Sequence, residues 1–235
     1  MNAGKIDTRP ISVLFESTLP ECEKDEADTL CQAIARVAKE SRELYMECIC
    51  QKQHCTGGGY FVCGDQYPLE AVLDVYVSKE QVCANTEKAR SFLGEARQNP
   101  KTTPYIHLVP GIREDADVHI LLTDPAGASR IIGLCAYYGH LAVDIVAGIS
   151  TCGALYRPLL EPEKVHLNLI DYYSRDHQLD AEGNRFYEPN ELLLSMTPKM
   201  YERLAQALPQ SAHGGVFIPE MHTNAAPPLH KESQS

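Results

Sequence analysis

Short apolar segments alternate with amphipathic helical segments through much of the chain, and this alternation limits the fold more than any other feature. Apolar runs bounded by turn residues are typical of buried strands, whereas apolar residues at helical spacing indicate a helix packed on one face. The segments expected to be strands are 10–15, 44–50, 104–109, 118–122, 141–147, 165–170 and 191–196. The pattern predicts an α/β fold with a mixed β-sheet and helices packed against it.

The chain of 235 residues is long enough to bury one large core, and no linker interrupts its middle. Residues 174–190 are polar and charged, which predicts a surface excursion. From Gln210 onward the composition shifts to Ser, Pro, Asn, His and Gly, which is typical of disordered segments. We therefore expect a single α/β domain over residues 1–209 and a disordered tail over residues 210–235.

Helix signals occur at four places, and three of them include a recognisable start. The segments expected to be helices are 26–40, 78–96, 124–138 and 197–208. Ser78 and Gln81 form a capping-box pattern. Asp124 and Thr197 each precede a proline, and an N-cap residue followed by proline at the first helical position is a strong start signal.

The charge balance excludes several classes of partner. Asp and Glu number 32 against 21 Lys and Arg, and the net charge is −11. Nucleic acids and anionic membranes both require a basic surface, so we expect neither as a partner. No apolar run approaches the roughly 20 residues that a membrane-spanning helix needs. The first residues lack the apolar region of a secretory signal, and we expect a cytoplasmic protein.

Nine cysteines are the unusual count in this composition. In a reducing compartment they serve as core residues, nucleophiles or metal ligands rather than disulfides. No pair has the C-x₂-C spacing of zinc ribbons, zinc fingers or ferredoxins. Any metal site must therefore draw its ligands from separate segments of the folded chain.

The segment around Cys55 combines a thiol, a histidine and a run of glycines. The glycines are Gly57, Gly58 and Gly59. Three consecutive glycines predict a loop over residues 51–59. Their N–H groups can hydrogen-bond an anion or a sulfide, so we expect them to take part in cofactor binding. His54, directly before Cys55, is the best candidate for an acid–base group or a ligand.

Several other residues are better explained by packing. Cys83 and Cys135 lie within predicted helices and are expected to behave as small hydrophobic residues. Cys22 lies in an acidic stretch and carries no clear signal. His107 and His119 lie in apolar strand contexts, which is more typical of partly buried structural histidines than of catalysts.

Cys48 and Cys50 alternate along a predicted strand and face the same side, which leaves core packing and a two-thiol face both open. Cys152 follows a predicted strand in a loop of small residues, where packing explains a cysteine less well.

Four pieces of the chain, taken in order, resemble the DUF169 family of archaea and anaerobic bacteria. The resemblance extends from the strand at residues 10–15 to the final helix near Leu208. The pieces are Cys31–Ile34, His54–Gly59, Asp124–Arg130 and Cys152 with its small neighbours. Family members tend to carry cysteines at the positions of Cys31, Cys55 and Cys152. Many carry another cysteine where this chain has Asp171.

The resemblance implies a shared three-cysteine core, and we expect Cys31, Cys55 and Cys152 to be metal ligands. Three thiolates from separate segments suit a 4Fe–4S cluster with one open iron. The corresponding function is an oxygen-sensitive enzyme of the lyase or desulfidase type, which acts on a small molecule by elimination, hydration or desulfurisation. His54 and Cys55 are its candidate catalytic residues.

Two alternatives stay open at this point. One is a metal-free enzyme with Cys55 as the nucleophile, His54 or His140 as the base and glycine N–H groups as the oxyanion site. The other is a non-catalytic metal or cofactor module, in which clustered cysteines bind zinc or copper(I). A homo-oligomer is compatible with every one of these hypotheses.

Overall fold

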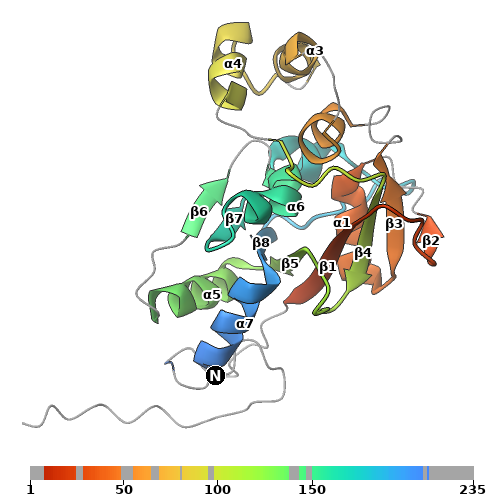
Figure 1. Cartoon of the computed structure of the whole chain (residues 1–235). Coiled ribbons are helices and arrows are strands. Elements are labelled where there is room, and N and C mark those ends of the chain that lie inside the picture. The colour runs from red at the N-terminus through yellow and green to blue at the C-terminus, as the bar shows by residue number, and fades with distance from the viewer. Residues whose placement is uncertain are drawn as a thin grey trace, which may run out of the picture.

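The computed structural model describes residues 8–24, 29–48, 55–64, 69–79, 81–94, 98–137, 143–146, 150–208 and 211. It shows a single α/β domain in which one mixed sheet is covered by helices (Figure 1), so the predicted fold class is confirmed. The predicted tail lies outside the described residues, apart from Ser211. No helix among the described residues has the length and apolar character needed to cross a membrane.

The sheet has eight strands, and most neighbours in it are antiparallel. In the order in which they lie side by side, the strands are β2 (Glu23–Lys24), β3 (Leu44–Glu47), β4 (Tyr105–Pro110), β1 (Arg9–Glu16), β5 (Val118–Thr123), β8 (Leu192–Met196), β7 (Val165–Asn168) and β6 (Val143–Val146). The pairs β2–β3 and β6–β7 are parallel. Each of the seven predicted strands has a counterpart in this sheet, although several are shorter than expected.

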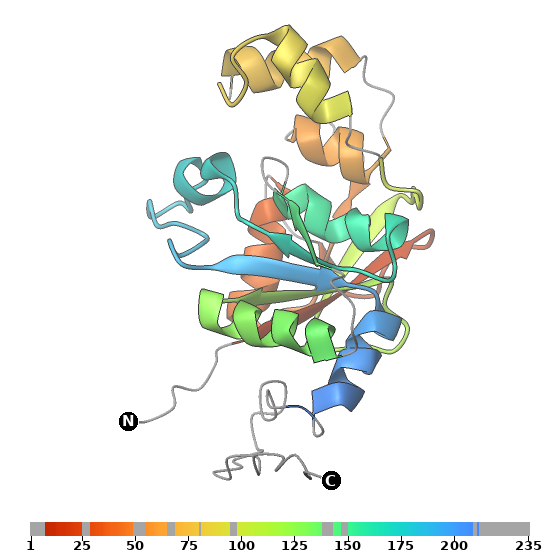
Figure 2. The ribbon, with the colours of Figure 1, turned by 90° about the vertical axis from the view of Figure 1, so that its left-hand side faces the viewer.

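Four of the helices form two layers on opposite faces of the sheet, while α3 and α4 lie beyond one end of it (Figures 1 and 2). The α-helices are α1 (Leu30–Glu40), α3 (Leu69–Asp74), α4 (Thr86–Gly94), α5 (Pro125–Tyr137), α6 (Ser150–Leu160) and α7 (Pro198–Ala207). Three further turns are π-helical: η1 (Gly58–Val62), η2 (Val75–Lys79) and η3 (Tyr173–His177). Helices α1 and α6 pack on one face, and α5 and α7 pack on the other.

Alternation along the central strands divides the core into these two layers. In β5, Ile120 and Leu122 belong to the cluster under α1 and α6, while Leu121 between them belongs to the cluster under α5 and α7. In β8, Leu193 and Leu194 divide in the same way. Successive side chains of a strand point to opposite faces, so a central strand covered on both sides is apolar throughout.

Two of the three predicted helix starts are confirmed. Asp124 accepts a hydrogen bond from the Gly127 amide at 2.8 Å, and α5 follows. Thr197 accepts one from the Met200 amide at 3.2 Å, and α7 follows. These side chains satisfy amides that a helix leaves without a partner in its first turn.

The capping box predicted at Ser78 is wrong. Ser78 lies in η2, and its hydroxyl donates to Asp74 Oδ1 at 2.7 Å. Helix α4 starts eight residues later at Thr86, where Asn85 accepts a hydrogen bond from the Lys88 amide at 3.0 Å. The sequence pattern was local, whereas the buried side chains of Val72, Leu73 and Tyr76 anchor the preceding α3–η2 segment in the core.

Candidate metal centre

Cys152 of α6 contacts two cysteines that are far from it in the sequence, one in α1 and one just before η1. The Cys152 side chain interacts directly with those of Cys31 and Cys55. The Cys31 contact contributes most, followed by the Cys55 contact and burial, and together they raise the pKa of Cys152 well above its usual value. Cys31 and Cys152 are buried, and Cys55 is partly exposed, so the group has one side toward solvent.

All three cysteines lie at or near the first turn of a helical segment. Cys31 is the second residue of α1, and Cys55 directly precedes the helical turn that leads into η1. Cys152 lies in the first turn of α6, so the prediction of a small-residue loop at this position is wrong. The N-terminal ends of helices carry partial positive charge, which favours anionic sulfur. The folded chain thus directs three such ends toward one group of thiols.

The first turn of α1 is fixed by polar contacts. Thr29 has extended backbone angles, and its hydroxyl oxygen accepts a hydrogen bond from the Gln32 amide at 3.3 Å. The same hydroxyl donates to Gln178 Oε1 at 2.6 Å. Tyr187 donates to the Cys31 carbonyl oxygen at 2.6 Å. These contacts set the position of the Cys31 backbone before any ligand is considered.

The glycines after Cys55 are helical, so the loop predicted over residues 51–59 is wrong for its described part. Gly57 has φ −64° and ψ −47°, which any residue can adopt. Its role is close packing instead. A Cβ atom at Gly57 would lie 3.2 Å from Tyr76 Oη and 4.0 Å from Cys152 Sγ. Glycine therefore lets the turn approach the Tyr76 hydroxyl closely, while Cys152 lies at ordinary contact distance.

The Cys55 sulfur also accepts a hydrogen bond from the backbone. The Gly58 amide nitrogen lies 3.2 Å from Cys55 Sγ, and the Gly59 amide donates to the Cys55 carbonyl oxygen at 2.8 Å. The Gly58 amide thus faces this thiol, and the part of the three glycines in cofactor binding stays a prediction. Hydrogen bonds to sulfur of this kind tune metal–thiolate sites.

Asp171 reaches the three-thiol group through Ser174. Ser174 Oγ lies 3.2 Å from Cys31 Sγ and 3.1 Å from Asp171 Oδ2. The Ser174 amide also donates to Asp171 Oδ1 at 2.9 Å. The polar segment expected as a surface excursion therefore includes residues that line the site. Its Tyr187 is fully buried against the same core.

Two polar side chains of α6 near Cys152 are buried without a partner among the described residues. They are the hydroxyls of Thr151 and Tyr156. Burial, followed by the charge of Cys152, raises the pKa of Tyr156. A buried hydroxyl without a hydrogen bond is costly, and in native proteins it commonly points to a bound group or an ordered water.

The other predicted site residues divide into three classes. His54, Cys50 and His140 lie outside the described residues. Cys48 and Cys63 are buried in the core shared with the three thiols. Cys135 lies on the opposite face of the sheet, where burial raises its pKa to about 11, in keeping with the predicted packing role.

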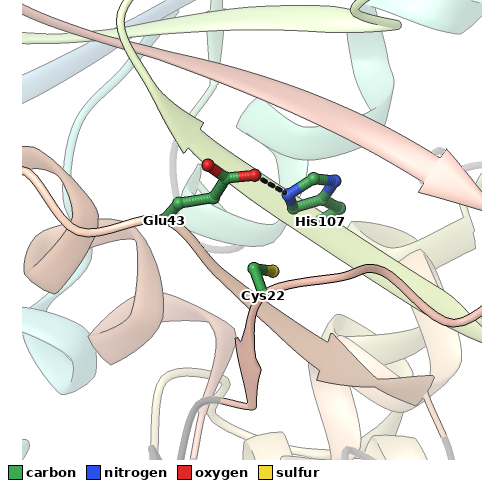
Figure 3. A group of neighbouring side chains, drawn as sticks. All are labelled: Cys22, Glu43 and His107. Carbon is green, nitrogen blue, oxygen red and sulfur yellow. Dashed lines mark hydrogen bonds and ion pairs between the residues drawn. The ribbon is translucent and has the colours of Figure 1, made fainter.

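A second group of potential ligands lies at the edge of the sheet and was missed by the sequence interpretation. One ligand atom from each of Cys22, Glu43 and His107 lies within 4.8 Å of the other two, and this group could hold a metal ion. Figure 3 shows the three side chains gathered from the segments before β2 and β3 and from β4. Glu43 is adjacent to a predicted strand and His107 is within one, but no spacing links them to Cys22.

The structure thus shows an α/β protein in which Cys152 contacts Cys31 and Cys55, and in which a separate Cys22, Glu43 and His107 group could hold a metal ion. The family model for DUF169, described as uncharacterised ArCR, matches residues 1–207. The chain belongs to this family, as the resemblance indicated. Comparison with curated proteins and with solved structures finds no match.

Proposed function

We propose that Cys31, Cys55 and Cys152 hold a 4Fe–4S cluster with one open iron, and that the protein is an oxygen-sensitive enzyme. The observation that carries the proposal is the contact of Cys152 with both other thiols. Bringing three thiols together in a protein interior has no evident packing advantage over apolar side chains. Soft thiolates from separate segments are the usual ligands of iron–sulfur clusters.

The surroundings of the thiols fit a bound anionic cluster. The Gly58 amide directs a polar hydrogen toward the Cys55 sulfur, and the Ser174 hydroxyl oxygen lies 3.2 Å from the Cys31 sulfur. The unpartnered Thr151 and Tyr156 hydroxyls supply two further buried donors nearby. Cys55 is the partly exposed member of the group, which favours its side as the approach for a small substrate.

When bound, such a cluster supplies a Lewis acid at its open iron, which suits elimination, hydration or desulfurisation of a small molecule. The chain's own residues would hold and tune it. Ser174 contacts both Asp171 and Cys31 and so links them. The family resemblance implies that many relatives carry another cysteine at the position of Asp171. A carboxylate at this position would bind a cluster iron more weakly than a thiolate, so the fourth iron would stay open to a substrate.

The metal-free nucleophile is the less favoured reading of the same thiols. That hypothesis needs only Cys55 as the nucleophile, and it gives no role to the contacts of Cys152 with Cys31 and Cys55. A non-catalytic metal module is the second candidate. The separate Cys22, Glu43 and His107 group favours it, because it adds a metal-binding arrangement with no link to the thiols.

The decisive experiment is anaerobic purification followed by iron, sulfide and zinc analysis and a visible spectrum. We expect about four iron and four sulfide per chain. Cys31→Ser, Cys55→Ser and Cys152→Ser should each lose most of the iron. Cys135→Ser is the matched control, since this buried cysteine lies on the other face of the sheet.

Circular dichroism of each variant separates cluster loss from unfolding. Folded protein that stays iron-free after anaerobic reconstitution would overturn the proposal. Selective alkylation of Cys55 in that protein would then support the nucleophile, and slow labelling of all thiols would favour the non-catalytic module.

A further inference from the structure

His107 occupies the centre of the second ligand group and is held between two carboxylates. Its Nε2 lies 2.8 Å from Glu43 Oε1, and its Nδ1 lies 3.0 Å from Glu16 Oε1. The residue lies in β4 between β1 and β3, opposite Leu14 and Tyr45, and its side chain is only 8% exposed. The ring therefore has little freedom to turn.

This arrangement matches the way in which proteins orient a metal-binding histidine. A ligating imidazole commonly gives its other ring nitrogen to a carboxylate, which fixes the ring and raises its basicity. Here Glu16 takes that role at Nδ1, and Nε2 faces Glu43 and Cys22. The histidine ligand thus has a supporting carboxylate, that of Glu16, which belongs to the neighbouring strand β1.

The local charge favours a cation. The carboxylates of Glu16 and Glu43 both lie near the Cys22 thiol, so two negative charges face the place where an ion would bind. The nearest arginines are engaged by other carboxylates: Arg42 pairs with Glu23 and Glu40, and Arg113 pairs with Asp115. Arg113 also acts on both glutamates at longer range, but its guanidinium stays bound to Asp115.

A catalytic thiol is a poor explanation of the same group. An activated cysteine needs a lowered pKa and a histidine nitrogen free to accept its proton. Both nitrogens of His107 are hydrogen-bonded to carboxylates. The carboxylates near Cys22 disfavour the thiolate form that an activated cysteine needs. Metal coordination would satisfy the thiol, the imidazole and the carboxylate together.

We propose that Cys22, Glu43 and His107 form a zinc site, with the fourth tetrahedral position open to water. A mixture of sulfur, imidazole nitrogen and carboxylate oxygen is characteristic of zinc, which takes such ligands at about 2.0–2.3 Å. The Glu43–His107 contact must widen only by a few tenths of an ångström, because ligands of a tetrahedral zinc ion lie roughly 3.3 Å apart.

Such an ion would fasten the segment before β2 to the edge of the sheet. Cys22 precedes β2, Glu43 precedes β3, and His107 lies within β4, so one ion would bind three segments that are separate in sequence (Figure 3). The edge strand β2 is only two residues long. A bound ion stabilises the folded state according to its affinity and concentration, because the unfolded chain does not preserve the site.

The test is a titration of chelator-treated full-length protein with Zn²⁺, and with Co²⁺ as a spectroscopic probe. In the Cys31, Cys55 and Cys152 triple serine variant, where the three-thiol site cannot bind cobalt, we expect one ion per chain, a visible spectrum of tetrahedral cobalt with a thiolate ligand, and a higher unfolding temperature with zinc. Cys22→Ser and Glu43→Gln should lose the thiolate band and the tight binding, respectively. Glu16→Gln should weaken binding by about 10- to 100-fold, as loss of a supporting carboxylate does elsewhere.

Two controls make the result specific. Cys83→Ser changes another partly exposed cysteine and should leave the titration unchanged. A triple Cys31, Cys55 and Cys152 serine variant should retain the cobalt signal, which separates this site from the proposed iron site. Cobalt binding that is absent, or unaffected by Cys22→Ser in folded protein, would overturn the zinc site whatever the iron analysis shows.

Discussion

The hydroxyl oxygen of Ser174 lies 3.2 Å from the sulfur of Cys31, across 143 residues of sequence. Ser174 also contacts the Asp171 carboxylate through both its backbone amide and its hydroxyl. A side chain of η3 thereby joins the first turn of α1 to the Asp171 carboxylate. The thiols thus have a polar neighbour, the Ser174 hydroxyl, with the Asp171 carboxylate next to it.

Ser174→Ala should weaken retention of the proposed cluster without unfolding the protein. Loss of a buried hydrogen bond to a charged group costs about 1–3 kcal/mol, and 1.4 kcal/mol corresponds to a factor of ten. We therefore expect iron to be lost roughly tenfold faster in air, followed by the decay of visible absorbance. Ser78→Ala is the matched control, since Ser78 also bonds an aspartate on its own turn but is exposed. Equal decay rates in the two variants would contradict the assigned role.

Tyr156→Phe should stabilise the metal-free protein, because the Tyr156 hydroxyl is buried without a partner among the described residues. An unsatisfied buried hydroxyl costs about 1–3 kcal/mol, and its removal should raise the free energy of unfolding by about 1 kcal/mol. Tyr187→Phe is the contrasting variant. Its hydroxyl donates to the Cys31 carbonyl oxygen, so its loss should destabilise the fold. Denaturant unfolding measures both, and a destabilised Tyr156→Phe would show that the hydroxyl has a partner.

Gly64→Ala should destabilise the protein for two separable reasons. Gly64 has φ +64°, and an added Cβ would lie 2.2 Å from Thr102 Cγ2. The left-handed conformation costs about 1–2 kcal/mol for alanine, and the clash should bring the total to about 2–4 kcal/mol. Gly111→Ala and Gly183→Ala have similar φ values but meet nothing within 4 Å, so they should show the backbone cost alone.

Adding Thr102→Ser to Gly64→Ala removes the clashing methyl group and should recover the steric part of the loss. Thermal or denaturant unfolding of the four variants tests this separation. A double variant as unstable as Gly64→Ala would contradict the assigned clash.

Stability should decrease as the pH falls from about 6.5 to 4 because of His119. Burial lowers the pKa of His119 to about 4, so the folded protein keeps it neutral while the unfolded chain takes up a proton below its ordinary value of 6.5. Its contribution is fully present above pH 6.5 and lost by pH 4, and amounts to about 3 kcal/mol. His119→Gln should therefore show a flatter curve of unfolding free energy against pH over this window. An unchanged difference between the two proteins across the window would contradict the prediction.

The environment of His119 explains why it stays neutral. Ser12 Oγ donates to the Gly111 carbonyl oxygen at 3.0 Å and lies 3.2 Å from His119 Nδ1, so the histidine nitrogen carries the hydrogen of that contact. The ring also packs edge-on against Tyr201, with centroids 5.2 Å apart. The sequence interpretation of a buried structural histidine agrees with this environment.

Local signals were sufficient for most of the fold. Strands such as β1 and β5 follow from short apolar runs, and α5 and α7 follow from an N-cap residue with proline at the first helical position. These patterns work because they report burial and backbone satisfaction within a few residues. The same reasoning placed a helix start at Ser78, where the core contacts of α3 and η2 decided otherwise.

The glycines after Cys55 show a second limit of local reasoning. Their composition predicted a loop, yet Gly57 and Gly58 are helical, and a Cβ atom at Gly57 would lie 3.2 Å from Tyr76 Oη. The reason for glycine at position 57 is thus a tertiary neighbour from the separate segment η2. A residue chosen for its missing side chain and one chosen for its flexibility look the same in a sequence.

The sequence by itself determined the alternation of strands and helices, the acidic charge and, through the family resemblance, which three cysteines to consider. Only the tertiary structure decided that Cys152 meets Cys31 and Cys55, and that Cys22 lies beside Glu43 and His107. Secondary structure depends on neighbours a few residues apart, whereas a ligand group depends on the sheet order that brings distant segments together. That order is set by packing of the whole core, which no single segment encodes.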